Sequence, residues 1–168
     1  MTTAWSYFTI ESFDWTPKEI GISLVAVGLI VAFVQGFLIG KAIDWFGKQK
    51  VVTFGFMLWT LGMFLFSQAS EPWMLYAFLI PYALGGVAGP TVQGIISNQV
   101  SVKEQGILQG SITGLVSVTA ILGQFIFAPV FYYFVRPETN FYFPGASFAT
   151  AALLLLVAFV LAKIAMNR

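Results

Sequence analysis

Cysteine and histidine are both absent from this sequence of 168 residues. Their absence excludes disulfide bonds, a thiol nucleophile and the side chains that most often bind zinc or haem iron. The remaining residues offer no nucleophile with a base in reach and no phosphate-binding loop. The sequence therefore predicts no enzyme activity, no cofactor and no metal site.

Charged side chains are scarce as well. They make up 9% of the sequence, whereas soluble domains contain about 25%. Hydrophobic residues make up 58%, and the mean hydropathy is +0.86. A chain with this balance cannot cover itself with polar surface in water, so we expect an integral membrane protein in a lipid bilayer. The net charge of +1 gives no sign of a nucleic-acid partner.

Long apolar runs make up most of the chain. A hydrocarbon core of about 30 Å takes roughly 20 helical residues, so residues 1–13 are too short to cross it and are predicted as a partial helix. Thr16 and Pro17 suit the start of the first complete span, because threonine caps helices and proline fits the first helical position. We predict an all-α membrane protein with one domain, residues 1–168, and five full transmembrane helices at residues 18–39, 51–67, 73–97, 106–135 and 144–166.

The most basic short connector is at residues 40–50, which contain three lysines and one aspartate, Asp44. Gly40 and Gly47 suit a tight reversal between two helices, since glycine accepts backbone angles closed to other residues. Short loops rich in lysine and arginine stay on the cytoplasmic side. With this loop and the carboxyl terminus inside, alternation leaves Lys18 and Arg136 outside and places six basic residues inside: Lys41, Lys48, Lys50, Lys103, Lys163 and Arg168.

Small residues recur at spacings that let helices approach closely. Their clusters also include a proline, Pro90, in the middle of the predicted span 73–97. Because proline in a helix frees backbone groups that neighbours must satisfy, we expect a bend there. The glycines that we expect at helix–helix contacts are Gly85, Gly86, Gly89, Gly106, Gly110 and Gly114.

Four polar residues follow one face of the predicted span 106–135. Gln109, Thr113, Ser117 and Gln124 advance by four, four and seven, which keeps them near one side of a helix. An unpaired amide in hydrocarbon costs several kcal/mol, so each should face other helices or a cavity. Two interpretations stay open from spacing alone: the face lines a substrate path, or it bonds across a helix interface.

Carboxylates are confined to the ends of the predicted spans and to the loops. Proton-driven transport normally uses an ionisable group within the membrane. If this chain belongs to a proton-coupled machine, we expect the proton carrier elsewhere, with Glu11 the one candidate here.

These motifs resemble those of a known family. Residues 40–48 resemble the Gly-x-x-x-Asp-x-(aromatic)-Gly-(basic) loop of the major facilitator superfamily, in its second copy. Residues 85–97 and 104–123 are similar to the family's tenth and eleventh spans. The Gln-Gly pairs at 93–94 and 109–110 indicate a narrower group within the superfamily. They resemble those of the tetracycline-resistance-type drug/proton antiporters. Gln124 departs from the family, which often has proline there.

The resemblance implies the carboxyl-terminal half of a facilitator bundle, in the plasma (bacterial inner) membrane, that takes part in drug efflux by alternating access. It begins inside the seventh span, so we expect a separate or covalent amino-terminal half as partner, an amphipathic substrate and protons, and no transport by this chain alone. The alternative is a truncated, non-transporting interaction or assembly subunit. The residues implied for the substrate cavity are Gln35, Pro90, Gln93, Gln109 and Ser117, and those implied for the gating loop are Gly40, Asp44 and Gly47.

Overall fold

The computed structural model describes residues 2–139 and 141–166, which form helices and no strand. The fold class predicted from the sequence, an all-α bundle with a short first helix, is confirmed. In chain order the elements are α1 (Thr2–Phe13), α2 (Pro17–Phe33), the π-helical turn η1 (Val34–Leu38), α3 (Ile39–Phe46), α4 (Lys48–Ser67), α5 (Pro72–Gly85), α6 (Ala88–Ser97), α7 (Gln105–Val135) and α8 (Ala146–Met166).

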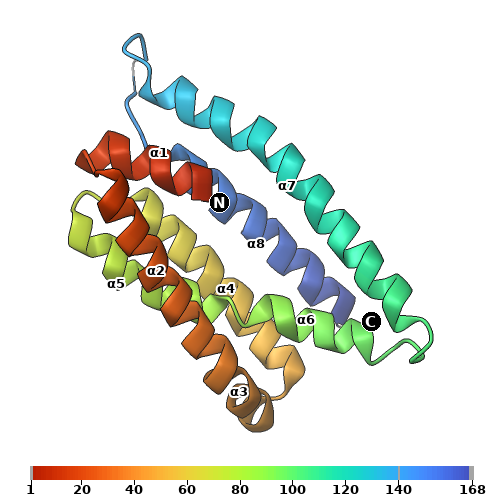
Figure 1. Cartoon of the computed structure of the whole chain (residues 1–168). Helices are drawn as coiled ribbons and strands as arrows, with labels where there is room; N and C mark the ends of the chain where they lie inside the picture. Colours follow the sequence, from red (N-terminus) through yellow and green to blue (C-terminus); the bar gives the residue numbers. More distant parts are fainter. Residues whose placement is uncertain (1, 140, 167–168) are drawn as a thin grey trace.

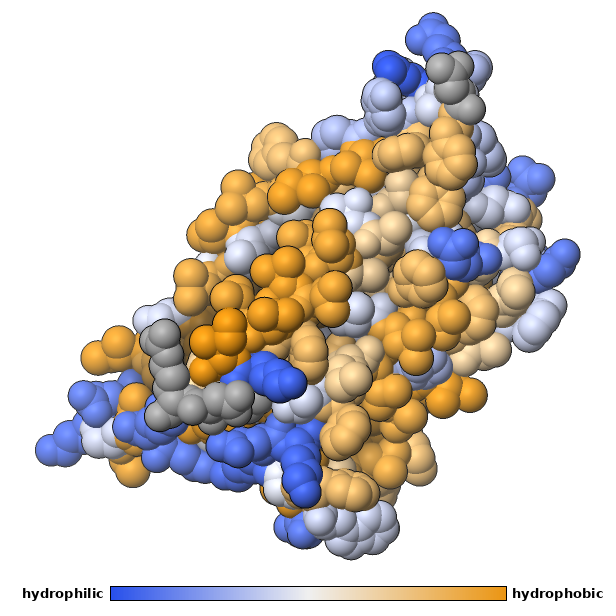
Figure 2. Space-filling model, turned by 180° about the vertical axis from the view of Figure 1, so that it is seen from behind, coloured by the Kyte–Doolittle hydropathy of each residue, from blue (hydrophilic) through white to orange (hydrophobic). Residues whose placement is uncertain are grey.

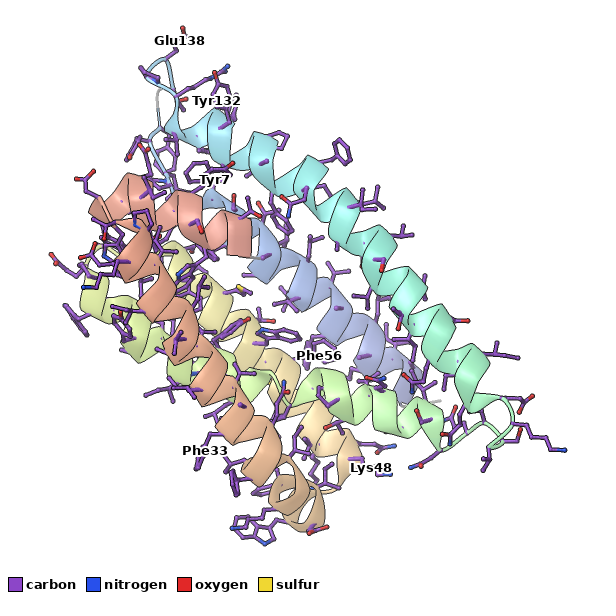
Figure 3. All side chains as sticks on the ribbon, viewed as in Figure 1. Tyr7, Phe33, Lys48, Phe56, Tyr132 and Glu138 are labelled. Atoms are coloured by element: carbon purple, nitrogen blue, oxygen red, sulfur yellow. The ribbon has the colours of Figure 1, made fainter. Side chains whose placement is uncertain are left out.

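Five of the helical stretches are long and apolar enough to cross a membrane. Helix α1 has 12 residues and is shorter than a span. The surface agrees with membrane insertion, because apolar side chains cover the middle of the molecule and hydrophilic ones gather at its ends (Figure 2). Figure 3 places Lys48 at one end and Glu138 at the other, with Phe33 and Phe56 between them. The five candidate spans are Pro17–Phe46, Lys48–Ser67, Pro72–Ser97, Gln105–Val135 and Ala146–Ala165.

The first span begins as expected and ends later than expected. Thr16 caps α2 in a capping box with Glu19, whose carboxylate accepts the Thr16 N–H at 2.8 Å. The helix then continues through η1 and α3 to Phe46. The prediction that Gly40 forms part of a reversal is therefore wrong, because Gly40 lies inside α3. The chain reverses at Gly47, whose φ of 79° falls in the region that favours glycine.

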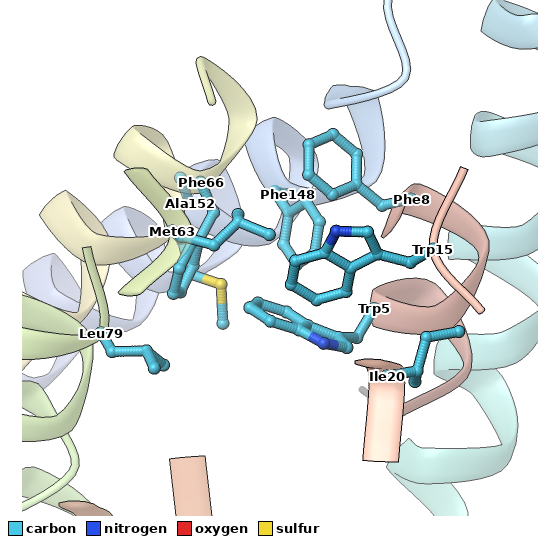
Figure 4. Packing of buried hydrophobic residues seen from close by; sticks show 10 residues of the cluster. Trp5, Phe8, Trp15, Ile20, Met63, Phe66, Leu79, Phe148 and Ala152 are labelled. Carbon is cyan, nitrogen blue, oxygen red and sulfur yellow. The ribbon is translucent and has the colours of Figure 1, made fainter. Parts of the chain in front are cut away.

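A cluster of aromatic side chains ties α1 to the bundle (Figure 4). The Trp5 ring meets Phe66 of α4 edge-on at 5.3 Å, and Phe8 meets Phe148 of α8 in the same way at 5.1 Å. The Trp5 indole N–H also donates a 2.9 Å hydrogen bond to the buried Ser23 hydroxyl of α2. Edge-to-face pairs contribute about 0.5–1.5 kcal/mol beyond their buried area. The short first helix is thus anchored to α2, α4 and α8.

Glycines on both sides of α4 set its distance from its neighbours. A Cβ added to Gly62 would lie 2.7 Å from the Tyr82 backbone of α5, and one added to Gly55 would lie 2.9 Å from Ala88 of α6. Gly85 meets the Trp59 backbone, which confirms it as a close-packing residue. The same prediction is wrong, within this chain, for four glycines where an added Cβ would meet open space: Gly89, Gly106, Gly110 and Gly114.

This difference predicts opposite effects for one substitution. Gly62→Ala is expected to lower the free energy of unfolding by about 1–3 kcal/mol, because the backbones of α4 and α5 must separate. Gly114→Ala, the matched control on α7, should be neutral or stabilising, since alanine is the better helix former. Thermal unfolding of both variants in detergent measures the contrast, and an equal loss in both would contradict it.

Helix α7 stands at one edge of the bundle (Figure 1). None of its described residues is buried. Tyr7 stacks on Phe131 at 5.9 Å, and the Ser147 hydroxyl donates a 3.0 Å hydrogen bond to the Phe127 carbonyl. These contacts attach α7 through its carboxyl-terminal half to α1 and α8. Its amino-terminal half therefore presents an uncovered face.

Candidate functional site: a broken span and a polar helix face

The span Pro72–Ser97 is broken between α5 and α6, where Gly86 and Val87 form a turn. Pro90 is the third residue of α6 and has no N–H to offer the carbonyl four residues earlier, which belongs to Gly86. The next residue restores the helical pattern, since the Thr91 N–H bonds the Val87 carbonyl at 3.2 Å. The predicted bend is confirmed, and it lies four residues before the proline that causes it.

The freed carbonyl has found a partner on another span. The Gln35 side-chain amide donates a hydrogen bond of 3.3 Å to the Gly86 oxygen. Gln35 lies in η1, a five-residue π-helical stretch inside an otherwise α-helical span. Such π turns are rare, and they occur frequently at functional sites. Two irregular backbone segments on different spans are thus joined by one side chain.

A second amide contact joins α6 to α7. The Gln93 amide donates to the Gln109 side-chain oxygen at 2.6 Å, and the Gln109 amide donates to the Ser97 hydroxyl at 3.4 Å. All three residues are incompletely buried. An amide pair of this kind satisfies groups that would be costly to leave alone in hydrocarbon. The first half of α7, which has few other contacts, is held to α6 by this bridge.

The polar face of α7 therefore divides into three parts. Gln109 bonds across the helix interface, whereas the Ser117 hydroxyl donates to the Thr113 carbonyl of its own helix at 2.9 Å. Gln124 lines an apolar pocket of about 330 Å³ between α1, α4, α7 and α8. None of the five residues implied for the cavity lines this pocket. Spacing along the sequence did not reveal the pocket. Whether those five line a substrate cavity stays a prediction.

The residues implied for the gating loop are spread over a helix end. Gly40 and Asp44 lie in α3, and Gly47 forms the turn into α4. Asp44 is exposed and precedes the turn by less than one helical turn. The amino terminus of α4 has no side-chain cap, because its N-cap is Gly47. The Asp44 carboxylate thus lies close in sequence to an uncapped, electropositive helix end.

Glu11 is placed at the opposite end of the molecule from this turn. Its carboxylate accepts a 2.8 Å hydrogen bond from the Tyr142 hydroxyl, which joins α1 to the connector between α7 and α8. Burial, followed by this contact with Glu11, raises the pKa of Tyr142 to about 12. The neutral hydroxyl therefore persists across physiological pH, and the contact is a structural link between two segments.

Five candidate spans, an apolar band and polar ends together define a multi-pass α-helical membrane protein. The chain belongs to the Major Facilitator Superfamily, whose family model matches residues 1–166. It is similar to the tetracycline resistance protein of class E from Escherichia coli, with 36% identity over 137 residues that cover 82% of this chain and 33% of that protein. It is also similar to the class C protein from the same organism, with 35% identity over 127 residues, 76% of this chain and 32% of that protein.

The class H tetracycline resistance protein of Pasteurella multocida is 32% identical over 133 residues, which cover 79% of this chain and 33% of that protein. The chain thus spans about a third of the length of the curated relatives it matches. No solved structure gives a match.

Proposed function

We propose that this chain forms the carboxyl-terminal half of a secondary active transporter that exports an amphipathic, tetracycline-like drug in exchange for protons. The proposal draws its substrate class from the tetracycline resistance proteins to which the chain is similar. Two helical halves rock about a site near the bilayer midplane and expose it to each side in turn. This chain alone supplies one half and does not transport.

The observation that carries the proposal is the break between α5 and α6, where the Gln35 amide bonds the Gly86 carbonyl. Discontinuous membrane helices expose backbone groups in midmembrane and commonly build the substrate sites of secondary transporters. Here the Gly86 carbonyl, the Gln35 amide and the Gln93–Gln109 pair offer both donors and acceptors beside apolar side chains. That mixture suits a molecule with polar edges on an apolar frame.

The uncovered face of α7 is the surface that the amino-terminal half would meet. Helix α7 has no buried residue in this chain, although it carries Gln109 and Ser117 along its first half. Polar groups at membrane depth need a partner or a water-lined cavity. Gln109 and Ser117 already have hydrogen-bond partners within this chain, and apposition of the two halves against α7 would place their remaining polar capacity between the halves.

Proton coupling in this proposal depends on the other half. The described carboxylates lie near the ends of the spans or in connectors, and Glu11, the candidate that the sequence offered, is bonded to Tyr142. An ionisable group deep in the membrane, which proton-driven transport normally uses, would come from the partner half. The bundle is oriented with Gly47 towards the cytoplasm of a bacterial plasma membrane, in agreement with the placement of lysine and arginine.

This orientation predicts which introduced thiols a membrane-impermeant maleimide reaches. Trp45 is 75% exposed next to the turn at Gly47, and Glu138 is exposed at the opposite end. The sequence contains no cysteine, so Trp45→Cys and Glu138→Cys each carry a single thiol. In intact cells we expect labelling at 138 alone, and at 45 only after permeabilisation. The reverse pattern would overturn the orientation.

The function is tested by supplying an amino-terminal half. Cells that express this chain, an amino-terminal half of the class E relative, or both are loaded with tetracycline, and accumulation is followed with and without a protonophore. We expect lower accumulation only when both halves are present, and the difference to vanish when the protonophore is added. Copurification of the halves without any change in accumulation would instead support the interaction-subunit alternative.

A further inference from the structure

A groove runs along the seam between α4 and α8. It encloses about 550 Å³. Its one hydroxyl-bearing side chain, Thr60, donates a 2.8 Å hydrogen bond to the Phe56 carbonyl and offers no free donor to the groove. The groove therefore presents apolar surface, contributed mainly by Met57, Leu61, Phe64, Leu153, Leu156 and Phe159.

The two ends of this groove differ. At the end near Gly145, the backbones of α4 and α8 meet, because an added Cβ would collide with the Ser67 carbonyl. The other end is open and basic. Lys50 lies in the first turn of α4, seven residues before Met57 and on the same helix face, and Lys163 lies one helical turn beyond Phe159 on α8; both are exposed. Helices α4 and α8 run antiparallel, which brings these lysines to the same end of the molecule (Figure 1).

Among the described residues, neither α4 nor α8 carries a carboxylate. Asp44 is in the preceding helix α3, on the other side of the Gly47 turn. The Glu104 carboxylate lies in the connector before α7, where it accepts hydrogen bonds from the Ser101 hydroxyl at 2.6 Å and the Ser101 N–H at 3.1 Å. Figure 2 shows the apolar middle of the molecule giving way to a hydrophilic end.

We propose that one anionic phospholipid occupies this seam, with its phosphate at Lys50 and Lys163 and an acyl chain in the α4–α8 groove. At 1.5 Å per residue, Phe159 lies about 6 Å and Ala149 about 21 Å beyond Lys163 along the helix. Half of the hydrocarbon core is about 15 Å, so the groove has the depth of a lipid from that leaflet. Basic pockets between spans are typical binding sites for anionic head groups.

The leaflet follows from the orientation in the proposed function: with Gly47 inside, the lipid belongs to the cytoplasmic leaflet. The site itself depends on the groove and the lysines, not on transport. A phosphate held by the lysines alone would not need the groove, and an acyl chain held by the groove alone would not need a negative charge. The proposal requires both, and the two requirements are tested separately.

Native mass spectrometry of the full chain in detergent measures lipid retention. We expect phosphatidylglycerol to remain bound and phosphatidylcholine, with matched acyl chains, to be retained about tenfold less. Lys50→Gln/Lys163→Gln should remove that preference. Lys41→Gln/Lys103→Gln makes the same charge change at the same end but away from the groove, and should keep it. Equal retention of the two lipids, or equal loss in both variants, would overturn the proposal.

The groove is tested with phosphatidylglycerol that carries a photoreactive group on its acyl chain. Adducts are expected on peptides of α4 and α8, and Ala149→Phe, which fills the groove, should reduce them several-fold while helicity and detergent elution stay unchanged. Adducts spread evenly over all spans would show bulk lipid contact and overturn the proposal, as would full displacement by glycerol 3-phosphate. Neither readout involves drug efflux, so either proposal can fail without the other.

Discussion

Asp44→Asn is expected to reduce drug efflux by about tenfold in the assembled transporter while the amount of protein in the membrane stays unchanged. Asp44 is exposed at the end of α3, and the neighbouring amino terminus of α4 has no side-chain cap. A carboxylate near such a helix end is stabilised by its unpaired N–H groups and by the helix dipole. When the cytoplasmic side of the transporter closes, the Asp44 carboxylate would bind the amino termini of neighbouring helices. The neutral amide of asparagine would bind them more weakly.

The measurement is tetracycline accumulation in cells that express both halves, with protein amounts compared by immunoblot. Asp44→Glu keeps the charge and should retain a larger share of efflux. Asp14→Asn is a matched control, because it makes the same change at the other end of the molecule and Asn tolerates the positive φ of 53° found there. Wild-type efflux from Asp44→Asn would remove the gating role from this residue.

Local chemistry made parts of this fold predictable. The start of α2 follows from Thr16 and Pro17, whose roles involve only neighbours in sequence. The end of that span did not follow, because apolarity marks the edge of the membrane and not the edge of the helix. Gly40 tolerates a helical conformation as well as a turn, so the helix continues through α3 to Phe46 and the chain reverses at Gly47.

Tertiary contacts account for what the sequence left open. A glycine packs closely only if a backbone stands opposite it: Gly62 meets Tyr82, whereas Gly114 meets nothing within this chain. The same holds for amides. Gln93 and Gln109 are sixteen residues apart, so their 2.6 Å bond depends on how α6 and α7 approach one another, which no helical periodicity encodes. Spacing alone identified the polar face of α7 without showing which of its members bond across helices.

The break between α5 and α6 makes a prediction in which two substitutions are coupled. Gln35→Leu should lower the free energy of unfolding by about 1–3 kcal/mol, since it leaves the Gly86 carbonyl without a partner at membrane depth. Pro90→Ala restores an N–H four residues after Gly86, and lets α5 and α6 join into one helix. In the Pro90→Ala background the carbonyl no longer needs Gln35, so Gln35→Leu should cost little.

Thermal unfolding of the two single variants and the double variant in detergent gives this coupling as a double-mutant cycle. Pro81→Ala serves as the control background, because Pro81 lies inside the continuous helix α5 and its removal should leave the cost of Gln35→Leu unchanged. Additive effects of Gln35→Leu and Pro90→Ala would show that the glutamine does not satisfy the freed carbonyl.

Efflux by Pro90→Ala should change in the opposite direction from its stability. With both halves present, this variant is expected to be at least as stable as wild type and to lose about tenfold in efflux, because a continuous helix no longer offers backbone groups to the substrate. A stable Pro90→Ala transporter with full efflux would separate the broken span from transport, even if the coupling to Gln35 held.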